Sequence, residues 1–177
     1  MKLDTIGVIG AGVMGSGVAQ VSAAAGYFAV VQDTDDSALE RSKSGIESSL
    51  KKLAEKGKIS EKDLEAAMGR IKYTTELEKA CQDADLVVEA VFEDLGVKQE
   101  LFEKIEQIAG PGAILASNTS ALPITEIASV SDRADKIIGI HFMNPVPLMK
   151  GVEIIRGQLT SDETCDTALD YIRSLVK

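Results

Sequence analysis

The sequence contains no tryptophan, two cysteines and a single histidine among its 177 residues. Cys81 and Cys165 lie far apart and form no metal-binding motif, so we expect reduced, buried or half-buried thiols and no metal site. The net charge of −9 argues against general nucleic-acid binding, which requires a basic surface. No apolar run is long enough to span a membrane, and the N-terminus leads almost directly into the first apolar segment, which predicts no signal peptide. These absences predict a cytoplasmic protein with no membrane or nucleic-acid partner.

A glycine-rich stretch near the N-terminus is the strongest motif in the chain. Apolar β-forming residues from Ile6 lead into glycines spaced G-x-G-x-x-G, and a helix-like run over residues 16–25 follows. The first glycine allows a tight turn, the second lets a pyrophosphate approach the backbone, and the third lets the helix pack close to the strand. The helix N-terminus would then bind the pyrophosphate. A tight turn without a ligand is the alternative. The predicted cofactor-contacting residues here are Gly10, Ala11, Gly12, Val13, Met14 and Gly15.

A carboxylate follows the second predicted strand, which spans Phe28–Gln32. Asp33 lies about 20 residues after Gly12, where a ribose-binding acid is expected in dinucleotide-binding domains. A carboxylate there can accept hydrogen bonds from both ribose hydroxyls of NAD and would repel the additional phosphate of NADP. The alternative is a helix N-cap, a position for which Asp35 and Asp36 compete. We therefore predict NAD as the cofactor.

Predicted strands alternate with predicted helices along the whole chain. Among them, residues 86–91 form a nearly continuous apolar run, which is typical of a buried parallel strand, and residues 95–109 form an amphipathic helix. This alternation predicts an α/β protein with a doubly wound, mostly parallel sheet. The length suffices for a substantial core but is short for two full domains. Ligands of such sheets bind outside the carboxyl ends of the strands, so the residues directly after strands are the candidate site residues.

The single histidine follows one of these strands. We predict a strand over residues 136–140 that ends at His141, followed by a stiff extended connection from Asn144 to Pro147. Imidazole titrates near neutrality and suits the general base of an alcohol oxidation. Glu153, at the start of the next strand, could orient it, although an ordinary strand-edge glutamate and a structural histidine are the alternatives. Ser120 and Asn144 are further hydrogen-bonding candidates, and Ser120 could equally cap a helix.

The long helix after Asp33 carries a polar face. Ser49 and Lys56 lie about two helical turns apart on it, among further lysines. Such a cluster in an acidic protein could hold a polyphosphate, but a solvated helix face explains the same pattern.

Five stretches resemble the L-3-hydroxyacyl-CoA dehydrogenase family, especially its bacterial 3-hydroxybutyryl-CoA dehydrogenases. They are GVIGAGVMGSG (7–17), DLVVEA (85–90), SNTS (117–120), HFMNPVP (141–147) and GVEII (151–155). The resemblance runs essentially from end to end, and the His-Phe-x-Asn-Pro signature is specific. It implies a Rossmann-type domain over residues 1–177 that takes part in the NAD-dependent interconversion of 3-hydroxyacyl-CoA and 3-oxoacyl-CoA, in fatty-acid or butyrate metabolism, with no metal.

The resemblance also implies roles for individual residues. His141 is similar to the catalytic base of the family and Glu153 to its partner acid, while Ser120 and Asn144 match active-site positions near the nicotinamide and the substrate. The remaining matches are NAD-contacting positions at Asp33, Glu93 and Lys98, and coenzyme-A-contacting positions at Ser49, Lys56, Ser120 and Asn144.

One departure from the family concerns length. Family members continue for roughly another hundred residues into a helical domain that closes the cleft and supplies most of the contact between subunits of their homo-oligomers. We therefore expect this chain to lack that domain and to be weakly active or inactive alone. The competing hypothesis is a non-catalytic nucleotide-binding or structural module, against which the presence of His141 and Glu153 argues.

Overall fold

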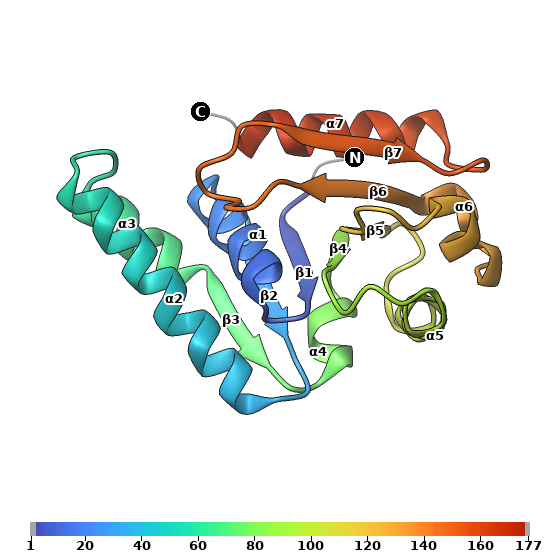
Figure 1. Ribbon diagram of the computed structural model, residues 1–177, viewed down its shortest axis with the longest axis horizontal. Coiled ribbons are helices and arrows are strands. Elements are labelled where there is room, and N and C mark those ends of the chain that lie inside the picture. Colours follow the sequence, from blue (N-terminus) through green and yellow to red (C-terminus); the bar gives the residue numbers. More distant parts are fainter. Residues whose placement is uncertain (1–2, 176–177) are drawn as a thin grey trace.

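Seven short segments rich in Val, Ile and Leu form a single sheet in the computed structural model, which describes residues 3–175 (Figure 1). The strands are β1 (Thr5–Ile9), β2 (Phe28–Gln32), β3 (Ile71–Thr74), β4 (Leu86–Glu89), β5 (Ile114–Ser117), β6 (Ile137–Phe142) and β7 (Val152–Arg156). Their order is β3-β2-β1-β4-β5-β6-β7; all neighbouring pairs are parallel except β6 and β7. The predicted α/β class and mostly parallel, doubly wound sheet are confirmed.

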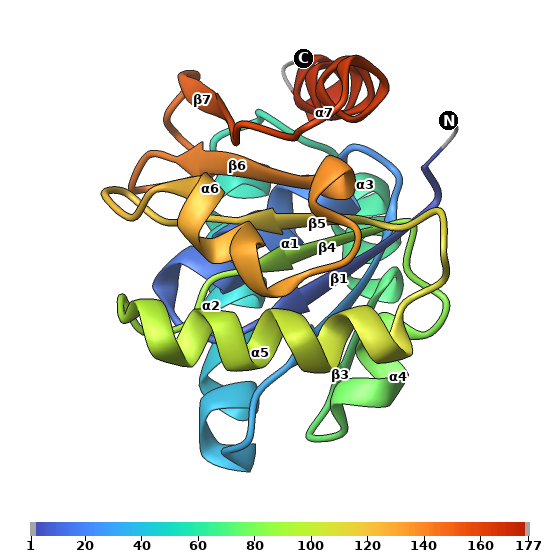
Figure 2. The same cartoon turned by 90° about the vertical axis from the view of Figure 1, so that its right-hand side faces the viewer.

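Helices cover both faces of this sheet. They are α1 (Val13–Ala24), α2 (Asp36–Glu55), α3 (Glu61–Gly69), α4 (Leu77–Cys81), α5 (Leu95–Ile108), α6 (Ile124–Ile127) and α7 (Asp162–Leu175), with short 3-10 turns at Ala128–Val130 and Ala134–Lys136. Figure 2 shows α5 lying across the strands on one side of the sheet, with α1, α2 and α3 on the opposite side of the sheet. α7 packs on β6, β7 and α1.

Each face of the sheet has its own hydrophobic core, because side chains alternate between the two faces along a strand. Ile6 and Val8 of β1 belong to the core shared with α1, α2, α3 and α7, whereas Ile9 belongs to the core shared with α4, α5 and α6. Gly7 allows close packing on the second face, since a Cβ there would overlap the carbonyl oxygen of Ala80 in α4. The two cores hold the strand ends at fixed positions.

The chain moves from β1 towards one edge of the sheet and from β4 towards the opposite edge. β1 lies between β2 and β4, so the chain crosses to one side of β1 for β2 and β3 and to the other side for β4, β5 and β6. In such sheets the crevice outside the carboxyl ends of the strands, where the order reverses, is the usual ligand site. The fold thus places the glycine-rich turn, Asp33 and the ends of β4, β5 and β6 along one edge.

The helix predicted over residues 16–25 begins earlier, at Val13, and the strand predicted over residues 86–91 ends at Glu89. Two details of the predicted elements around His141 were also wrong. The Asn144–Pro147 segment is a turn and not an extended connection, because the backbone N–H groups of Leu148 and Met149 both donate to the carbonyl oxygen of Pro145, at 2.9 and 3.1 Å. The strand predicted to end at His141 includes it and continues to Phe142. Pairing with β7 explains the extension, because the register joins Phe142 to Val152.

Candidate functional site

The glycine-rich turn leaves the N-terminus of α1 open. Gly10 has a φ of 101°, which favours glycine, and its N–H donates to the Gln32 carbonyl oxygen at 2.8 Å. A Cβ on Gly15 would overlap the Gly10 carbonyl oxygen, whereas a Cβ on Gly12 would meet nothing within 4 Å. No side chain caps α1, and its first turn contains no acidic residue. Open space above uncapped N–H groups fits an anionic group such as a pyrophosphate.

Asp33 lies against this turn. Its Oδ2 accepts a hydrogen bond from the Ala11 N–H at 2.8 Å, and its Oδ1 accepts one from the Asp35 N–H at 3.1 Å. The N-cap of α2 is Asp35, whose side chain accepts from the Ser37 N–H at 2.8 Å. The structure therefore assigns the capping role to Asp35 and places the half-buried Asp33 carboxylate beside the glycine-rich turn. This arrangement fits the ribose next to a bound pyrophosphate.

His141 and Glu153 face each other across β6 and β7. They are partners in the antiparallel register, and Nδ1 of His141 lies 3.0 Å from Oε2 of Glu153. A carboxylate only accepts hydrogen bonds, so the neutral imidazole that donates to it carries its hydrogen on Nδ1 and its lone pair on Nε2. Nε2 has no partner among the described residues, and the His141 side chain is 20% exposed. The pair can therefore accept a proton from a group outside the sheet.

The turn after β6 is packed onto α1. A Cβ added to Gly17 of α1 would lie 2.6 Å from Cβ of Val146, so only glycine lets the turn approach this closely. Asn144 shares a groove of about 500 Å³ with Gly12 and Asp33. The fold thus brings Asn144, from the C-terminal half of the chain, to the glycine-rich turn.

Glu93 holds the loop that contains Ser120. Its Oε1 accepts from the Thr119 hydroxyl and from the Ser120 N–H, the latter at 3.1 Å. Burial alone would raise the pKa of Glu93, but the Thr119 hydrogen bond and the charge of Lys98 together lower it below its usual value. Lys98 itself is 1% exposed and also pairs with Glu89. Ser120 is exposed at the carboxyl edge of the sheet.

Ser49 and Lys56 belong to α2 and its C-cap and do not line the groove that Asn144 shares with Gly12 and Asp33. Ser49 is half-buried within α2 and Lys56 is the exposed C-cap of that helix. α2 packs against α1, α3 and β3. Neither side chain has a hydrogen-bond or ion-pair partner in the part of the chain that the structure describes, so both are available to a ligand.

Sequence reasoning missed the buried residues behind the site. Glu89, Ser117 and Thr119 form hydrogen bonds that join the ends of β4 and β5. The signal in the sequence is Glu89, the one charged residue in the otherwise apolar run of residues 86–91.

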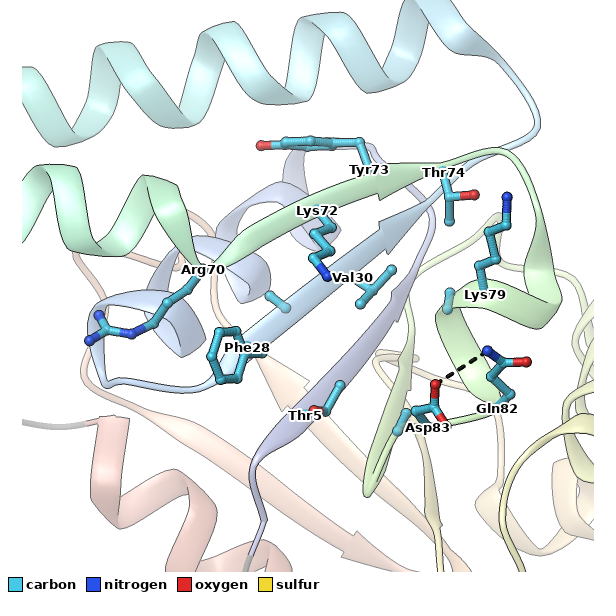
Figure 3. A pocket seen from close by; sticks show the side chains of 13 residues that line it. Thr5, Phe28, Val30, Arg70, Lys72, Tyr73, Thr74, Lys79, Gln82 and Asp83 are labelled. Carbon is cyan, nitrogen blue, oxygen red and sulfur yellow. Dashed lines mark hydrogen bonds between the residues drawn. The ribbon is translucent and has the colours of Figure 1, made fainter.

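A separate hollow of about 580 Å³ lies between β2, β3 and α4 (Figure 3). Its lining includes Phe28, Arg70 and Lys72 and none of the predicted site residues, so it is not part of the candidate site. Among residues 3–175, no group of three or more His, Cys, Asp or Glu side chains could hold a metal ion. No helix in the same range is both long enough and apolar enough to cross a membrane.

Known proteins resemble this chain in sequence and in fold. Residues 5–177 match the family model described as "3-hydroxyacyl-CoA dehydrogenase, NAD binding domain". The chain is 51% identical over 171 residues to a "Probable 3-hydroxybutyryl-CoA dehydrogenase" of Deinococcus radiodurans, covering 97% of this chain and 61% of the relative. A relative of the same description from Bacillus subtilis is 47% identical, with 97% and 58% covered.

A solved structure is also similar. The (S)-3-hydroxybutyryl-CoA dehydrogenase of Ralstonia eutropha superimposes with a TM-score of 0.96 at 40% identity, covering 99% of this chain and 62% of that one. The chain thus spans about three-fifths of the length of the relatives that it matches.

Proposed function

Because this chain belongs to the 3-hydroxyacyl-CoA dehydrogenase family and matches its NAD-binding domain, we propose that it forms the cofactor-binding part of an NAD-dependent oxidoreductase. The proposed reaction interconverts a 3-hydroxyacyl-CoA, 3-hydroxybutyryl-CoA in particular, and the corresponding 3-oxoacyl-CoA. The observation that carries the proposal is the His141–Glu153 pair, in which Nε2 of His141 has no partner among the described residues. The same domain also has a glycine-rich turn with open space for a cofactor.

In the oxidation direction, Nε2 of His141 takes the proton of the substrate 3-hydroxyl group. Bound NAD supplies the acceptor for the hydride that leaves C3, so the C3–O bond becomes a carbonyl. Glu153 accepts the hydrogen bond of Nδ1–H, fixes the tautomer and stabilises the imidazolium that forms. In the reduction direction the imidazolium returns its proton to the oxygen. The roles proposed for Ser120 and Asn144 are hydrogen bonds to the substrate and the nicotinamide end of the cofactor.

The proposed cofactor contacts follow from the residues that fit a dinucleotide. Gly12 leaves space for the pyrophosphate, and the Asp33 carboxylate would accept from the ribose hydroxyls. Ser49 and Lys56 are proposed to bind the nucleotide end of coenzyme A. We also propose a cytoplasmic location, a role in fatty-acid or butyrate metabolism, and homo-oligomers for the complete enzyme.

The test is turnover of acetoacetyl-CoA with NADH, followed by the loss of absorbance at 340 nm. The chain is joined to the remaining part of the Deinococcus radiodurans relative, because the relatives are longer than the part that it matches. The proposal predicts oxidation of NADH that depends on acetoacetyl-CoA. The competing hypothesis, a non-catalytic nucleotide-binding module, predicts NADH binding without turnover in the same chimera.

A further inference from the structure

The carboxyl edge of the sheet contains a buried ion pair. Glu89, the last residue of β4, is 0% exposed, and Lys98 of α5 is 1% exposed. Their charged atoms are 2.6 Å apart. In residues 3–175 no other Asp, Glu, Lys or Arg side chain is buried to this degree. Removing two charges from water is costly, and replacing such pairs by apolar residues is often neutral or stabilising. Stability alone therefore does not explain why the chain has this pair.

The Glu89 carboxylate connects the ends of two strands. Its Oε1 accepts from the Lys98 ammonium and from the Val91 N–H at 2.7 Å, and its Oε2 accepts from the Ser117 hydroxyl at 2.6 Å. The Ser117 oxygen in turn accepts from the Thr119 N–H at 3.2 Å. One carboxylate thus binds both the chain directly after β4 and the last residue of β5.

The network extends to β6, beside the proposed base. The Asn118 N–H donates to the Glu89 carbonyl oxygen at 2.8 Å, and the Asn118 side-chain oxygen accepts from the Phe142 N–H at 2.9 Å. Phe142 is the residue after His141. The strand ends that carry the predicted site residues are therefore joined by hydrogen bonds through Asn118.

Lys98 joins this network to Glu93. Its ammonium lies 3.2 Å from Oε2 of Glu93, while Oε1 of the same carboxylate accepts from the Ser120 N–H. Glu93 is partly exposed and can reach a ligand, but Glu89 is fully enclosed. Glu89 can influence a ligand only through the groups that it holds.

We propose that Glu89 is a positioning residue for the cofactor end of the site. Through Lys98 it orients the Glu93 carboxylate, and through Ser117 it holds the loop that presents Ser120. In this arrangement Lys98 acts on the cofactor through Glu93. This proposal rests on the proposed function, because it assumes that Glu93 and Ser120 lie against bound NADH.

The test removes both charges together in the double variant Glu89→Gln/Lys98→Met. Losing a complete buried pair leaves no isolated charge, so the thermal midpoint should stay close to that of the original chain. NADH affinity, measured by calorimetry on the 177-residue chain, should nevertheless fall at least about tenfold. The Ser120 amide resonance should shift in the protein without ligand. A merely structural role predicts unchanged NADH affinity wherever stability is kept, and that result would overturn the proposal.

A matched control and a gentler variant complete the experiment. Glu106→Gln removes a carboxylate near the other end of α5, where it pairs with Arg133 at 3.5 Å, and should leave NADH affinity unchanged. Ser117→Ala keeps both buried charges and removes only the hydrogen bond to Glu89. It should weaken NADH binding in the same direction by a smaller factor, so the proposal can be tested even if the double variant does not fold. Wild-type affinity in a folded Ser117→Ala chain would refute the role of this connection.

The outcomes separate this proposal from the proposed function. If the original chain binds NADH but its chimera does not turn over acetoacetyl-CoA, the proposed reaction fails while the positioning role is still judged by affinity. If the chimera turns over and the double variant binds NADH normally, the reaction stands and the positioning role of Glu89 is wrong.

Discussion

Two glycines of the same motif should respond oppositely to an added methyl group. At Gly12 a Cβ meets nothing within 4 Å, and the backbone angles of φ −69° and ψ −173° are open to alanine. Gly12→Ala should therefore fold normally, with a stability change within about 1 kcal/mol, because the less flexible unfolded chain offsets the preference of an N-cap for glycine over alanine. At Gly15 a Cβ would overlap the Gly10 carbonyl oxygen, a backbone atom that cannot move aside. Gly15→Ala should lose about 3 kcal/mol or more.

Cofactor binding should show the reverse sensitivity in the folded proteins. The methyl group of Gly12→Ala occupies the space above the α1 N-terminus and holds the pyrophosphate away from the backbone N–H groups. A hydrogen bond to a charged group contributes about 1.5–3 kcal/mol, so losing one weakens NADH binding about 10- to 150-fold.

Calorimetric titration of NADH and thermal unfolding of the 177-residue chain measure both effects. A loss of 3 kcal/mol corresponds to about 6–12 °C in the thermal midpoint for a chain of this size. Gly69→Ala is the control, because its Cβ also meets nothing within 4 Å but lies at the end of α3. Normal NADH affinity in Gly12→Ala, or normal stability in Gly15→Ala, would refute the account of this turn.

Three further predictions concern separate parts of the molecule. Lys56→Glu should weaken acyl-CoA binding about fivefold at low salt and less at high salt, with NADH binding unchanged. Lys52→Glu on the same helix should have little effect, and equal effects of the two variants would argue for a solvated helix face. The chain should prefer NADH to NADPH in calorimetric titrations, and Asp33→Asn should reduce that preference at least about tenfold. Equal affinities of the original chain for NADH and NADPH would show that Asp33 does not contact the ribose. Burial raises the pKa of the Cys81 thiol to about 12, so at pH 8 a thiol reagent should label the partly exposed Cys165 and reach Cys81 only after unfolding. Because of the same shift, the Cys81 thiol loses its proton at a lower pH in the unfolded chain than in the folded chain. The free energy of unfolding should therefore fall as the pH rises from 9 towards 12.

Local chemistry explains what the sequence alone could predict. The glycine spacing and the alternation of strands and helices depend on neighbouring residues, so the fold class and the open turn before α1 could be inferred. The choice between Asp33 and Asp35 as helix cap required coordinates, because both lie within a few residues of the helix start. The structure shows that Asp35 caps α2, which leaves Asp33 against the turn.

Long-range register explains what could not be predicted. Contact between His141 and Glu153 depends on β7 running antiparallel to β6 with these two residues opposite each other, and the spacing along the chain does not specify that pairing. The Glu89–Lys98 pair depends on α5 packing its N-terminal turn over the end of β4. Its members come from an apolar strand and an amphipathic helix, so neither pattern by itself marked them as partners.

The most direct test of the proposed reaction is the effect of His141→Gln on turnover. In the chimera, reduction of acetoacetyl-CoA by NADH should fall by about 10²–10⁴-fold, because the proton donor and acceptor is lost. NADH affinity measured by calorimetry should stay unchanged, since His141 is not part of the proposed pyrophosphate or ribose contacts. Glu153→Gln should reduce turnover less, because it removes charge support but keeps an acceptor for Nδ1–H. Wild-type turnover in a folded His141→Gln protein would contradict the mechanism.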